Sequence, residues 1–115
     1  MTTIVLVDDD KDLVEITAEL LKLSKIDILG VGYDGKQAVD LCTKHNPDFL
    51  ILDLSMPDFD GFYALEKLKG TKTKMIIITG SIGKENRTKL EPFHPFAVRT
   101  KPLKHDGLLK ILNNT

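Results

Sequence analysis

The sequence predicts a doubly wound α/β fold, in which five parallel strands form one sheet and helices cover both faces. Short runs rich in Val, Ile and Leu alternate with segments of helical periodicity. The runs are apolar throughout rather than at every second position, as expected for parallel strands buried on both faces. A length of 115 residues suits a single domain, which we expect to span residues 1–115.

Strand and helix segments follow one another in alternation along the chain. A strand at residues 3–7 precedes a helix at 11–24. In that helix a set of apolar residues recurs at helical spacing, namely Leu13, Ile16, Leu20 and Leu23. Further strands are expected at residues 26–31, 48–53, 74–79 and 96–100, and further helices after Gly35 and at 61–69, 83–91 and 105–113. Right-handed crossovers between parallel strands then place helices on both faces.

Turn and helix-ending residues separate these segments. Asp34-Gly35 marks the turn before the second helix, and Asn46-Pro47 ends that helix. Gly70 closes the third helix. The segment at 83–91 is the weakest, because Leu90 is its only apolar residue and a helix there would be polar on nearly all sides.

Composition excludes several classes of protein. No apolar stretch approaches the roughly 20 residues that span a bilayer, and the first residues lack the pattern of a secretory signal. The single cysteine, Cys42, rules out an internal disulfide and is typical of a reducing compartment. A pI of about 6.3 and few aromatic residues disfavour nucleic-acid binding. We therefore expect a cytoplasmic protein with no direct nucleic-acid partner and no membrane association.

Charge is unevenly distributed along the chain, although the net charge is only -1. Residues 1–80 hold 9 basic and 14 acidic side chains, whereas residues 81–115 hold 7 basic and 3 acidic ones. The positive excess in the C-terminal part predicts a partner-facing surface there.

Chemically able side chains stand at the ends of four predicted strands. Asp8 and Asp9 follow the first strand, and Asp53 ends the third. Thr79 ends the fourth strand, and Lys101 follows the fifth. Ligands bind at the carboxyl ends of the strands in an open parallel sheet, so we expect these side chains to converge.

The acids among them predict a metal site. Asp8, Asp9 and Asp53 would crowd several carboxylates together, and such a cluster needs a cation because like charges repel at short range. Oxygen ligands of this kind select a hard cation, and Mg²⁺ or Mn²⁺ fits best. The next acid, Asp10, is expected to cap the helix that follows.

The remaining groups suit phosphoryl transfer. A carboxylate attacks, a divalent ion and Lys101 neutralise the phosphoryl oxygens, and the Thr79 hydroxyl donates to one of them. The product is an aspartyl phosphate. Pro102 directly follows the lysine and predicts a cis peptide bond between Lys101 and Pro102.

Four motifs together resemble receiver domains of two-component response regulators, and the chain is similar to the stand-alone chemotaxis type. They are Val-Asp-Asp at 7–9, Leu-Asp-Leu-Ser-Met-Pro-Asp-Phe-Asp-Gly at 52–61, Ile-Thr-Gly at 78–80 and Thr-Lys-Pro at 100–102. The resemblance covers essentially the whole chain. It implies a flavodoxin-like fold and a phosphorylation switch that is not itself an enzyme.

The resemblance also implies a role for each site residue. Asp53 is the expected phosphoacceptor, and Thr79 and Lys101 are expected to contact the phosphoryl group. The implied metal ligands are Asp8, Asp9, Asp53 and the backbone carbonyl of Ser55. The implied phosphodonor is a phosphohistidine on a sensor histidine kinase or a histidine phosphotransfer protein. A downstream protein partner is expected to bind the Gly80–Thr115 face.

The sequence departs from the family pattern at three places. The aromatic residue that usually precedes the lysine by three positions is Val98 here, and Phe96 is expected to substitute for it from the same strand face. The span from Asp53 to Thr79 is short, which predicts a trimmed third helix. Phe93-His94-Pro95-Phe96 replaces the usual small residues before the last strand.

Two other functions remain as alternatives. A phosphorylation-independent pseudo-receiver would use the same fold only as an interaction module. A phosphatase of the haloacid dehalogenase type would use Asp8 as nucleophile and Asp10 as acid/base, but that interpretation leaves Asp53 and the turn after it unexplained.

If the chain is a receiver, the switching element is expected in the Gly80–Val98 segment, which contains the marginal helix and follows Thr79.

Overall fold

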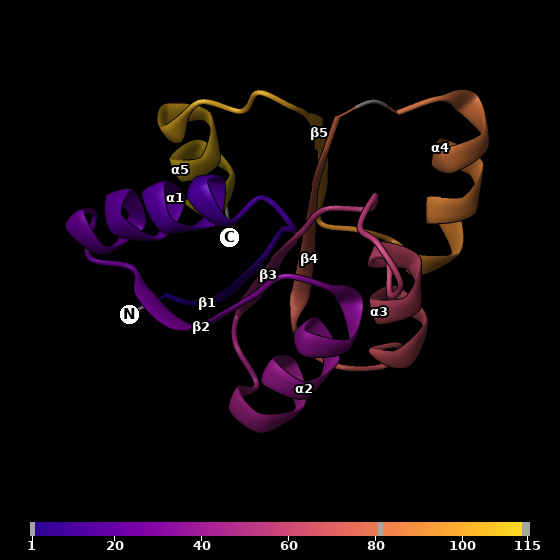
Figure 1. Ribbon diagram of the computed structural model, residues 1–115, viewed down its shortest axis with the longest axis horizontal. Helices are drawn as coiled ribbons and strands as arrows, with labels where there is room; N and C mark the ends of the chain where they lie inside the picture. Colours follow the sequence, from indigo (N-terminus) through magenta and orange to yellow (C-terminus); the bar gives the residue numbers. More distant parts are fainter. Residues whose placement is uncertain (1, 81, 114–115) are drawn as a thin grey trace.

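A computed structural model describes residues 2–80 and 82–113 and shows one parallel sheet with the strand order β2-β1-β3-β4-β5 (Figure 1). The strands are β1 (Thr3–Val7), β2 (Asp27–Gly32), β3 (Phe49–Leu52), β4 (Lys74–Thr79) and β5 (Ala97–Thr100). The helices are α1 (Lys11–Leu23), α2 (Gly35–His45), α3 (Gly61–Lys67), α4 (Lys84–Leu90) and α5 (His105–Asn113), and a 3₁₀ turn, η1 (Glu91–Phe93), follows α4. The predicted fold class is confirmed.

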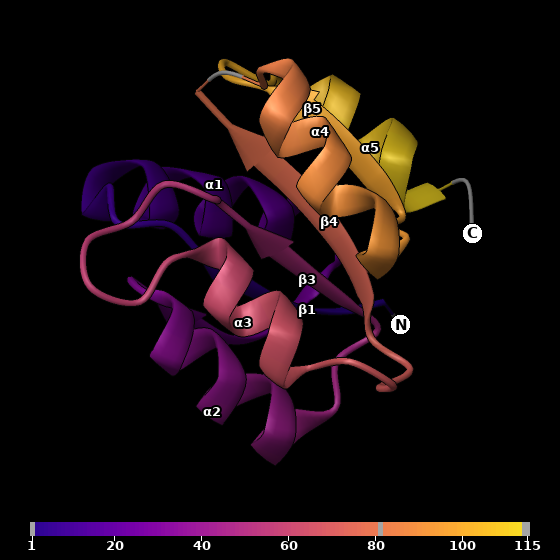
Figure 2. The same cartoon turned by 90° about the vertical axis from the view of Figure 1, so that its right-hand side faces the viewer.

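Helices cover both faces of the sheet. Helices α1 and α5 lie on one face, and α2, α3 and α4 lie on the other (Figures 1 and 2). Alternate residues of the strands feed two separate cores, as the twofold side-chain period of a strand requires. In β1, Ile4 and Leu6 pack towards α1 and α5, whereas Val5 and Val7 pack towards α2 and α3. Within the described residues, no helix has the length and apolar character needed to cross a membrane.

Several elements have the predicted bounds, and the observed bounds of the others differ from the prediction by a few residues. The predicted strands at 3–7 and 74–79 and the helix at 105–113 have the observed bounds. Strand β3 ends at Leu52, so that Asp53 stands just beyond the strand. Helix α3 ends at Lys67, shorter than predicted, and Gly70 adopts a positive φ of 82° in the turn that follows.

The apolar residues whose spacing predicts α1 are not the ones that pack on the sheet. The side chains that pack on the sheet are Val14, Ala18 and Leu21. The residues that mark the helical spacing are exposed, with relative exposures of 38% for Leu13, 59% for Ile16, 38% for Leu20 and 81% for Leu23. Both sets have helical spacing, so periodicity alone does not separate them. The buried face contains Ala18, whose small side chain lets the helix approach the sheet closely.

Three aspartates fix where helices begin. Asp10, Asp34 and Asp60 each stand at an N-cap, and each side chain accepts a hydrogen bond from a backbone N–H in the first turn of α1, α2 and α3, respectively. Such a cap satisfies a backbone donor that the helix itself leaves without a partner. The expected capping role of Asp10 is confirmed, because its carboxylate accepts from Leu13 N at 3.2 Å.

The turn after β3 closes against the backbone at Gly61. The Gly61 N–H donates to the Leu54 carbonyl at 3.0 Å, which brings the start of α3 against the segment that follows Asp53. A Cβ atom on Gly61 would lie 2.5 Å from the Asp53 carbonyl oxygen and 2.8 Å from Leu54 Cα. These are backbone atoms, so the neighbouring chain would have to shift.

Replacing Gly61 with alanine should therefore destabilise the protein. We expect Gly61→Ala to lower the free energy of unfolding by about 1–3 kcal/mol, the usual cost of forcing extra volume into a packed site. Urea denaturation followed by circular dichroism measures this change. Gly80→Ala is the control, because a Cβ atom there meets nothing within 4 Å. Equal stability of the two variants would show that the close approach at Gly61 is not a real constraint.

Candidate functional site

Three acidic side chains meet at the carboxyl edge of the sheet. Asp8 follows β1 and Asp53 follows β3, two neighbouring strands on either side of the point where the strand order reverses. One carboxylate oxygen from each of Asp8, Asp9 and Asp53 lies within 4.8 Å of the others. Asp8 and Asp53 are only 6% and 4% exposed, whereas Asp9 is open to solvent. The predicted convergence of these acids is therefore observed.

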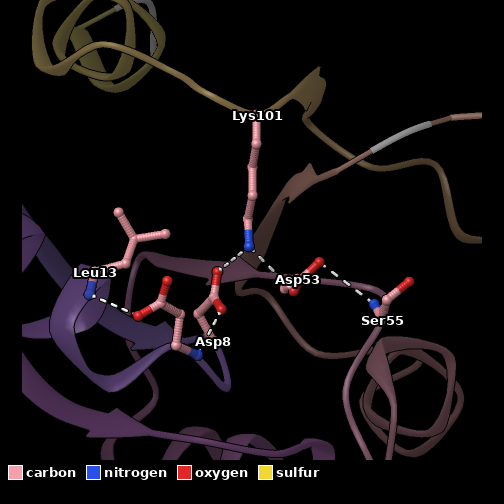
Figure 3. A network of polar contacts seen from close by, with 6 residues as sticks. Asp8, Leu13, Asp53, Ser55 and Lys101 are labelled. Carbon is pink, nitrogen blue, oxygen red and sulfur yellow. Dashed lines mark hydrogen bonds and ion pairs between the residues drawn. The ribbon is translucent and has the colours of Figure 1, made fainter.

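Lys101 bridges the two buried acids. Its Nζ atom lies 2.7 Å from Asp8 Oδ2 and 3.2 Å from Asp53 Oδ2 (Figure 3). The side chain reaches across from the segment after β5, and its backbone is fixed to β4 because Lys101 N donates to the Thr79 carbonyl at 2.7 Å. The Lys101–Pro102 peptide bond is cis, as predicted.

Local hydrogen bonds orient the two buried carboxylates. Asp8 Oδ1 accepts from Asp10 N at 3.0 Å, and Asp53 Oδ1 accepts from Ser55 N at 3.3 Å (Figure 3). Asp53 N in turn donates to the Val7 carbonyl at 3.2 Å, which ties the end of β3 to the end of β1. Asp53 Oδ2 thus has a charged partner in Lys101, whereas Oδ1 has the neutral N–H of Ser55.

Burial and the neighbouring charges together shift the pKa values of Asp9 and Lys101. The pKa of Asp9 is raised by partial burial and by the hydrogen bond and negative charges of Asp8 and Asp53. Partial burial lowers the pKa of Lys101, but the adjacent Asp8 and Asp53 carboxylates outweigh that effect and leave it raised. Lys101 is therefore a fixed positive charge at neutral pH, and the acids still outnumber it.

The donor set fits a hard divalent cation. Three carboxylates face one ammonium group, so the cluster carries excess negative charge that a divalent cation offsets. Oxygen ligands without cysteine or histidine select Mg²⁺ or Mn²⁺ rather than zinc. Ser55 lies at the edge of the cluster and contributes its N–H to Asp53. A role for its carbonyl as a metal ligand remains a prediction.

Thr79 is the last residue of β4 and is 1% exposed. Its strand, β4, lies between β3, which precedes Asp53, and β5, which precedes Lys101. Its backbone carbonyl is the acceptor for Lys101 N, so Thr79 and Lys101 are fixed relative to each other. The four strand endings predicted to form one site therefore lie at one edge of the sheet.

The expected substitution of Phe96 for the missing aromatic residue is wrong. Phe96 lies before β5, and its ring makes an edge contact with Phe49, at the start of β3, with centroids 5.5 Å apart. Its backbone N donates to the Met75 carbonyl, near the start of β4. Phe96 is thus at the opposite end of the sheet from Thr79. Val98 pairs with Ile77 and packs in the core, as its place in the middle of β5 requires.

Other side chains that could carry chemistry lie outside the site. Cys42 is 3% exposed, and burial raises its pKa to about 12, which makes it an inert packed thiol. His105 contacts the Ser24 hydroxyl at 3.1 Å and lies on the helix face towards α1. Asp10 is engaged in its helix cap, so the acid/base role that a phosphatase would need is not supported.

An apolar cavity that was not predicted from the sequence adjoins the acids. A cavity of about 190 Å³ opens beside Asp8, Asp53 and Lys101, and aliphatic side chains from α1, α5 and the sheet line most of it. Leu13 and Leu103 lie in its wall. The lining residues come from β1, α1, β3, β4, α5 and the segment before α5, so no local motif could have revealed the cavity.

Comparison with known proteins places this site in a family. A sequence model of the response regulator receiver domain matches residues 4–113. The transcriptional regulatory protein DesR of Bacillus subtilis is 38% identical over 80 residues, which are 69% of this chain and 40% of that protein. The transcriptional regulatory protein CpxR of Escherichia coli is 36% identical over 85 residues, 74% of this chain and 36% of that protein. The matched part is thus well under half the length of these relatives.

Solved structures share the whole fold. A LuxR-family DNA-binding response regulator from Staphylococcus aureus superposes with a TM-score of 0.91 at 26% identity, covering 99% of this chain and 98% of that one. The receiver domain of the Francisella response regulator 1452 gives a TM-score of 0.87 at 28% identity, covering 99% and 95%. A CheY-like receiver protein from Methanospirillum hungatei gives 0.92 at 21% identity, covering 99% and 92%, a likeness of fold alone.

Removing one charge from the cluster should stabilise the metal-free protein. The pKa of Asp9 is raised in the folded state, so its ionised form is less favourable there than in the unfolded chain at neutral pH. We expect Asp9→Asn to melt at a higher temperature than the wild type in EDTA and to gain less on addition of Mg²⁺. The difference in EDTA should shrink as the pH falls and Asp9 becomes protonated.

Thermal unfolding followed by circular dichroism at pH 7 measures both effects. Asp40→Asn, at an exposed position on α2, is the matched control for loss of one negative charge. A lower melting temperature of Asp9→Asn in EDTA would contradict the repulsion that we infer.

Proposed function

This chain belongs to the response regulator receiver domain family of two-component systems, and on that basis we propose that Asp53 accepts a phosphoryl group in a reaction that requires a divalent cation. One observation supports this assignment above the others. The Lys101 ammonium lies within ion-pair distance of both Asp8 and Asp53, so the acceptor carboxylate and the charges around it are already assembled.

The proposed reaction is an in-line displacement at phosphorus. An oxygen of Asp53 attacks the phosphorus atom of a phosphohistidine, the P–N bond breaks, and the imidazole nitrogen leaves with the bonding pair. Lys101 offsets the negative charge of the phosphoryl oxygens, and the Thr79 hydroxyl donates to one of them. Asp53 Oδ1 is the better candidate for the attacking atom, because Oδ2 is held by Lys101 while Oδ1 has only the 3.3 Å contact to Ser55.

Asp8, Asp9, Asp53 and the Ser55 carbonyl are the residues that would hold Mg²⁺ or Mn²⁺. A cation bound there supplies positive charge that offsets the carboxylates and the incoming phosphoryl oxygens. Lys101 and the cation share the same anionic partners, Asp8 and Asp53. Phosphorylation needs both positive charges, because several phosphoryl and carboxylate oxygens then crowd around one point.

Phosphorylation would act on the rest of the protein through Thr79 and Lys101. The two residues are joined by a backbone hydrogen bond, so a shift of either towards the phosphoryl group is passed to the ends of β4 and β5. The chain leads from Thr79 through Gly80 into α4, whose only buried residue is Leu90. A helix with so small a buried face is readily displaced, and we propose that it is the element whose position phosphorylation biases.

The proposed output surface is the Gly80–Thr115 face, within which Ser81, Asn114 and Thr115 lie outside the described residues. Val98 offers no ring to swing between two positions, so coupling to this face cannot use an aromatic rotamer at that point. Coupling to this face would instead run through the backbone of β4 and β5 into α4. We propose that a downstream protein binds here and distinguishes the two states.

The exposed α1 stripe (Leu13, Ile16, Leu20 and Leu23) is the surface where we propose that the phosphodonor protein binds. Its members recur with alternating steps of three and four residues, the spacing of a coiled-coil seam, which suits another helix. Leu13 also lines the cavity beside Asp53, so a helix on the stripe lies next to the acceptor. A sensor histidine kinase or a histidine phosphotransfer protein would supply that helix.

Receiver domains in general are signalling modules rather than enzymes, and we propose the same for this chain, acting in the cytoplasm. Engagement of Asp10 in the α1 cap disfavours the phosphatase reading. The pseudo-receiver reading makes a different prediction, namely that no phosphoryl group is accepted at all.

Phosphorylation should depend on Asp53 and on a divalent cation. We expect intact-mass analysis to show one added phosphoryl group after incubation with acetyl phosphate and Mg²⁺, with acetate as the leaving group. Asp53→Asn and chelation by EDTA should each abolish the labelling. Retained labelling of a folded Asp53→Asn variant would refute the assignment. Absence of labelling in the wild type would favour the pseudo-receiver.

A charge placed in the α1 stripe should slow transfer from a protein donor only. Ile16 is 59% exposed, so Ile16→Glu should leave the fold and the reaction with acetyl phosphate unchanged. We expect the initial rate of transfer to fall at least about tenfold with a purified phosphorylated histidine kinase that labels the wild type, because a charge is buried unpaired at the interface. Lys22→Glu, on the same helix but outside the stripe, is the control. Equal rates for Ile16→Glu and the wild type would exclude the stripe as the docking surface.

A further inference from the structure

A groove lies at the opposite end of the sheet from Asp53, lined by the segment that joins α3 to β4 and by residues that precede β5. Figure 2 shows the segment that joins α3 to β4 at its lower right. Its volume is about 370 Å³, within the range of sites that hold a ligand or an inserted side chain. We call it the basal groove and define it by Lys69, Lys72, Lys74, Phe93, His94 and Phe96. It is separate from the phosphoryl site and from the stripe on α1.

The walls of the basal groove carry only positive charge. Its described lining contains Lys69, Lys72, Lys74 and His94, and no acidic side chain. Lys69 forms one exposed ion pair, with Glu66 at 3.4 Å, which is worth little in water. Across the described residues, Lys72 and Lys74 form no ion pair. A molecule of net charge -1 therefore holds a local site that favours an anion.

Aromatic rings hold two of these lysines in place. Lys69 Nζ lies 5.3 Å from the centroid of the Phe93 ring, and Lys74 Nζ lies 5.2 Å from that of Phe96. Such contacts are favourable, and they keep the ammonium groups at the rim of the groove rather than free in solvent. The floor is apolar, since Leu65, Leu68 and Met75 also line the groove. Phe96 is 37% exposed, one of few large apolar side chains on the surface.

We propose that the basal groove binds an acidic peptide segment of a partner protein, with one large apolar side chain on the floor and flanking Asp or Glu carboxylates on the lysines. A ligand that fits an apolar floor and a basic rim must carry both an apolar group and acidic groups. A concave site of this size does not fit a flat membrane. Among the described residues, no arginine lines the groove. Arginine is the side chain that best matches phosphate groups and stacks on bases, so a nucleic acid is the poorer match.

Binding at the basal groove does not require phosphorylation. The groove is built at the amino-terminal edge of the sheet, whereas Asp8, Asp53 and Lys101 lie at the carboxyl edge. A partner could therefore hold the receiver here while Asp53 gains or loses a phosphoryl group. Binding at the basal groove is therefore independent of whether Asp53 accepts a phosphoryl group.

Fluorescence anisotropy with a fluorescein-labelled peptide of sequence DDELFEDD tests this inference, using the full 115-residue chain. The comparison peptide, DDESSEDD, has the same charge but no apolar centre. Lys69→Glu/Lys72→Glu removes positive charge from the rim at two exposed positions. Lys36→Glu/Lys104→Glu makes the same change in net charge at exposed positions elsewhere. Circular dichroism confirms that each variant is folded.

We expect DDELFEDD to bind the wild type, with affinity that falls as salt concentration rises. Loss of the apolar centre and the Lys69→Glu/Lys72→Glu change should each weaken binding at least about tenfold, whereas Lys36→Glu/Lys104→Glu should change it less than about twofold. In ¹⁵N-resolved spectra, the shifted amides should fall within residues 65–75 and 92–97.

Three results would overturn the proposal. One is the absence of DDELFEDD binding at millimolar peptide concentration. Another is equal weakening by the two double variants, which would indicate a response to net charge only. The third is tighter binding of the oligonucleotide (dT)₈ than of the peptide, which would identify the groove as a nucleic-acid site.

Discussion

The contact of the Lys101 ammonium with Asp8 and Asp53 is the interaction on which the rest of the site depends. Two nearly buried carboxylates on neighbouring strands repel each other, and Lys101 offsets that repulsion at 2.7 and 3.2 Å. The strand order places the acids together, and the hydrogen bond between Lys101 N and the Thr79 carbonyl places the lysine over them. A change in the charge of Asp53 therefore alters its electrostatic interaction with Lys101. Because Lys101 follows β5 and is hydrogen-bonded to Thr79, the change also acts on β4 and β5.

Aspartate serves two purposes in this chain, and its hydrogen-bond partners tell them apart. Asp10, Asp34 and Asp60 accept from backbone N–H groups in the first turns of helices, where they hold the helix starts in place. Asp8 and Asp53 instead face Lys101, while Asp9 remains open to solvent with a raised pKa. The Asp10 and Asp60 caps hold the ends of the loops that carry the cluster, because those loops join β1 to α1 and β3 to α3.

Most of the fold and the centre of the site could be predicted, because both follow from local patterns. Continuous apolar runs mark buried parallel strands, and polar residues at their ends converge by topology, as Asp8, Asp53 and Thr79 show. The α1 face could not be predicted, since two apolar stripes share one helical period and only packing against the sheet chooses between them. Phe96 was misplaced because its position depends on where β5 begins. The basal groove combines a loop, a 3₁₀ turn and two strand starts, so no single segment of sequence reveals it.

The most direct test of the central claim is to identify the carboxylate that carries the phosphoryl group. Borohydride reduces an aspartyl phosphate to homoserine, and peptide mass spectrometry then identifies the converted position in protein treated with acetyl phosphate and Mg²⁺. The account predicts conversion at Asp53 alone. Conversion at Asp8 would contradict it, because Asp8 would then be the nucleophile and the Lys101–Asp53 contact would be only structural.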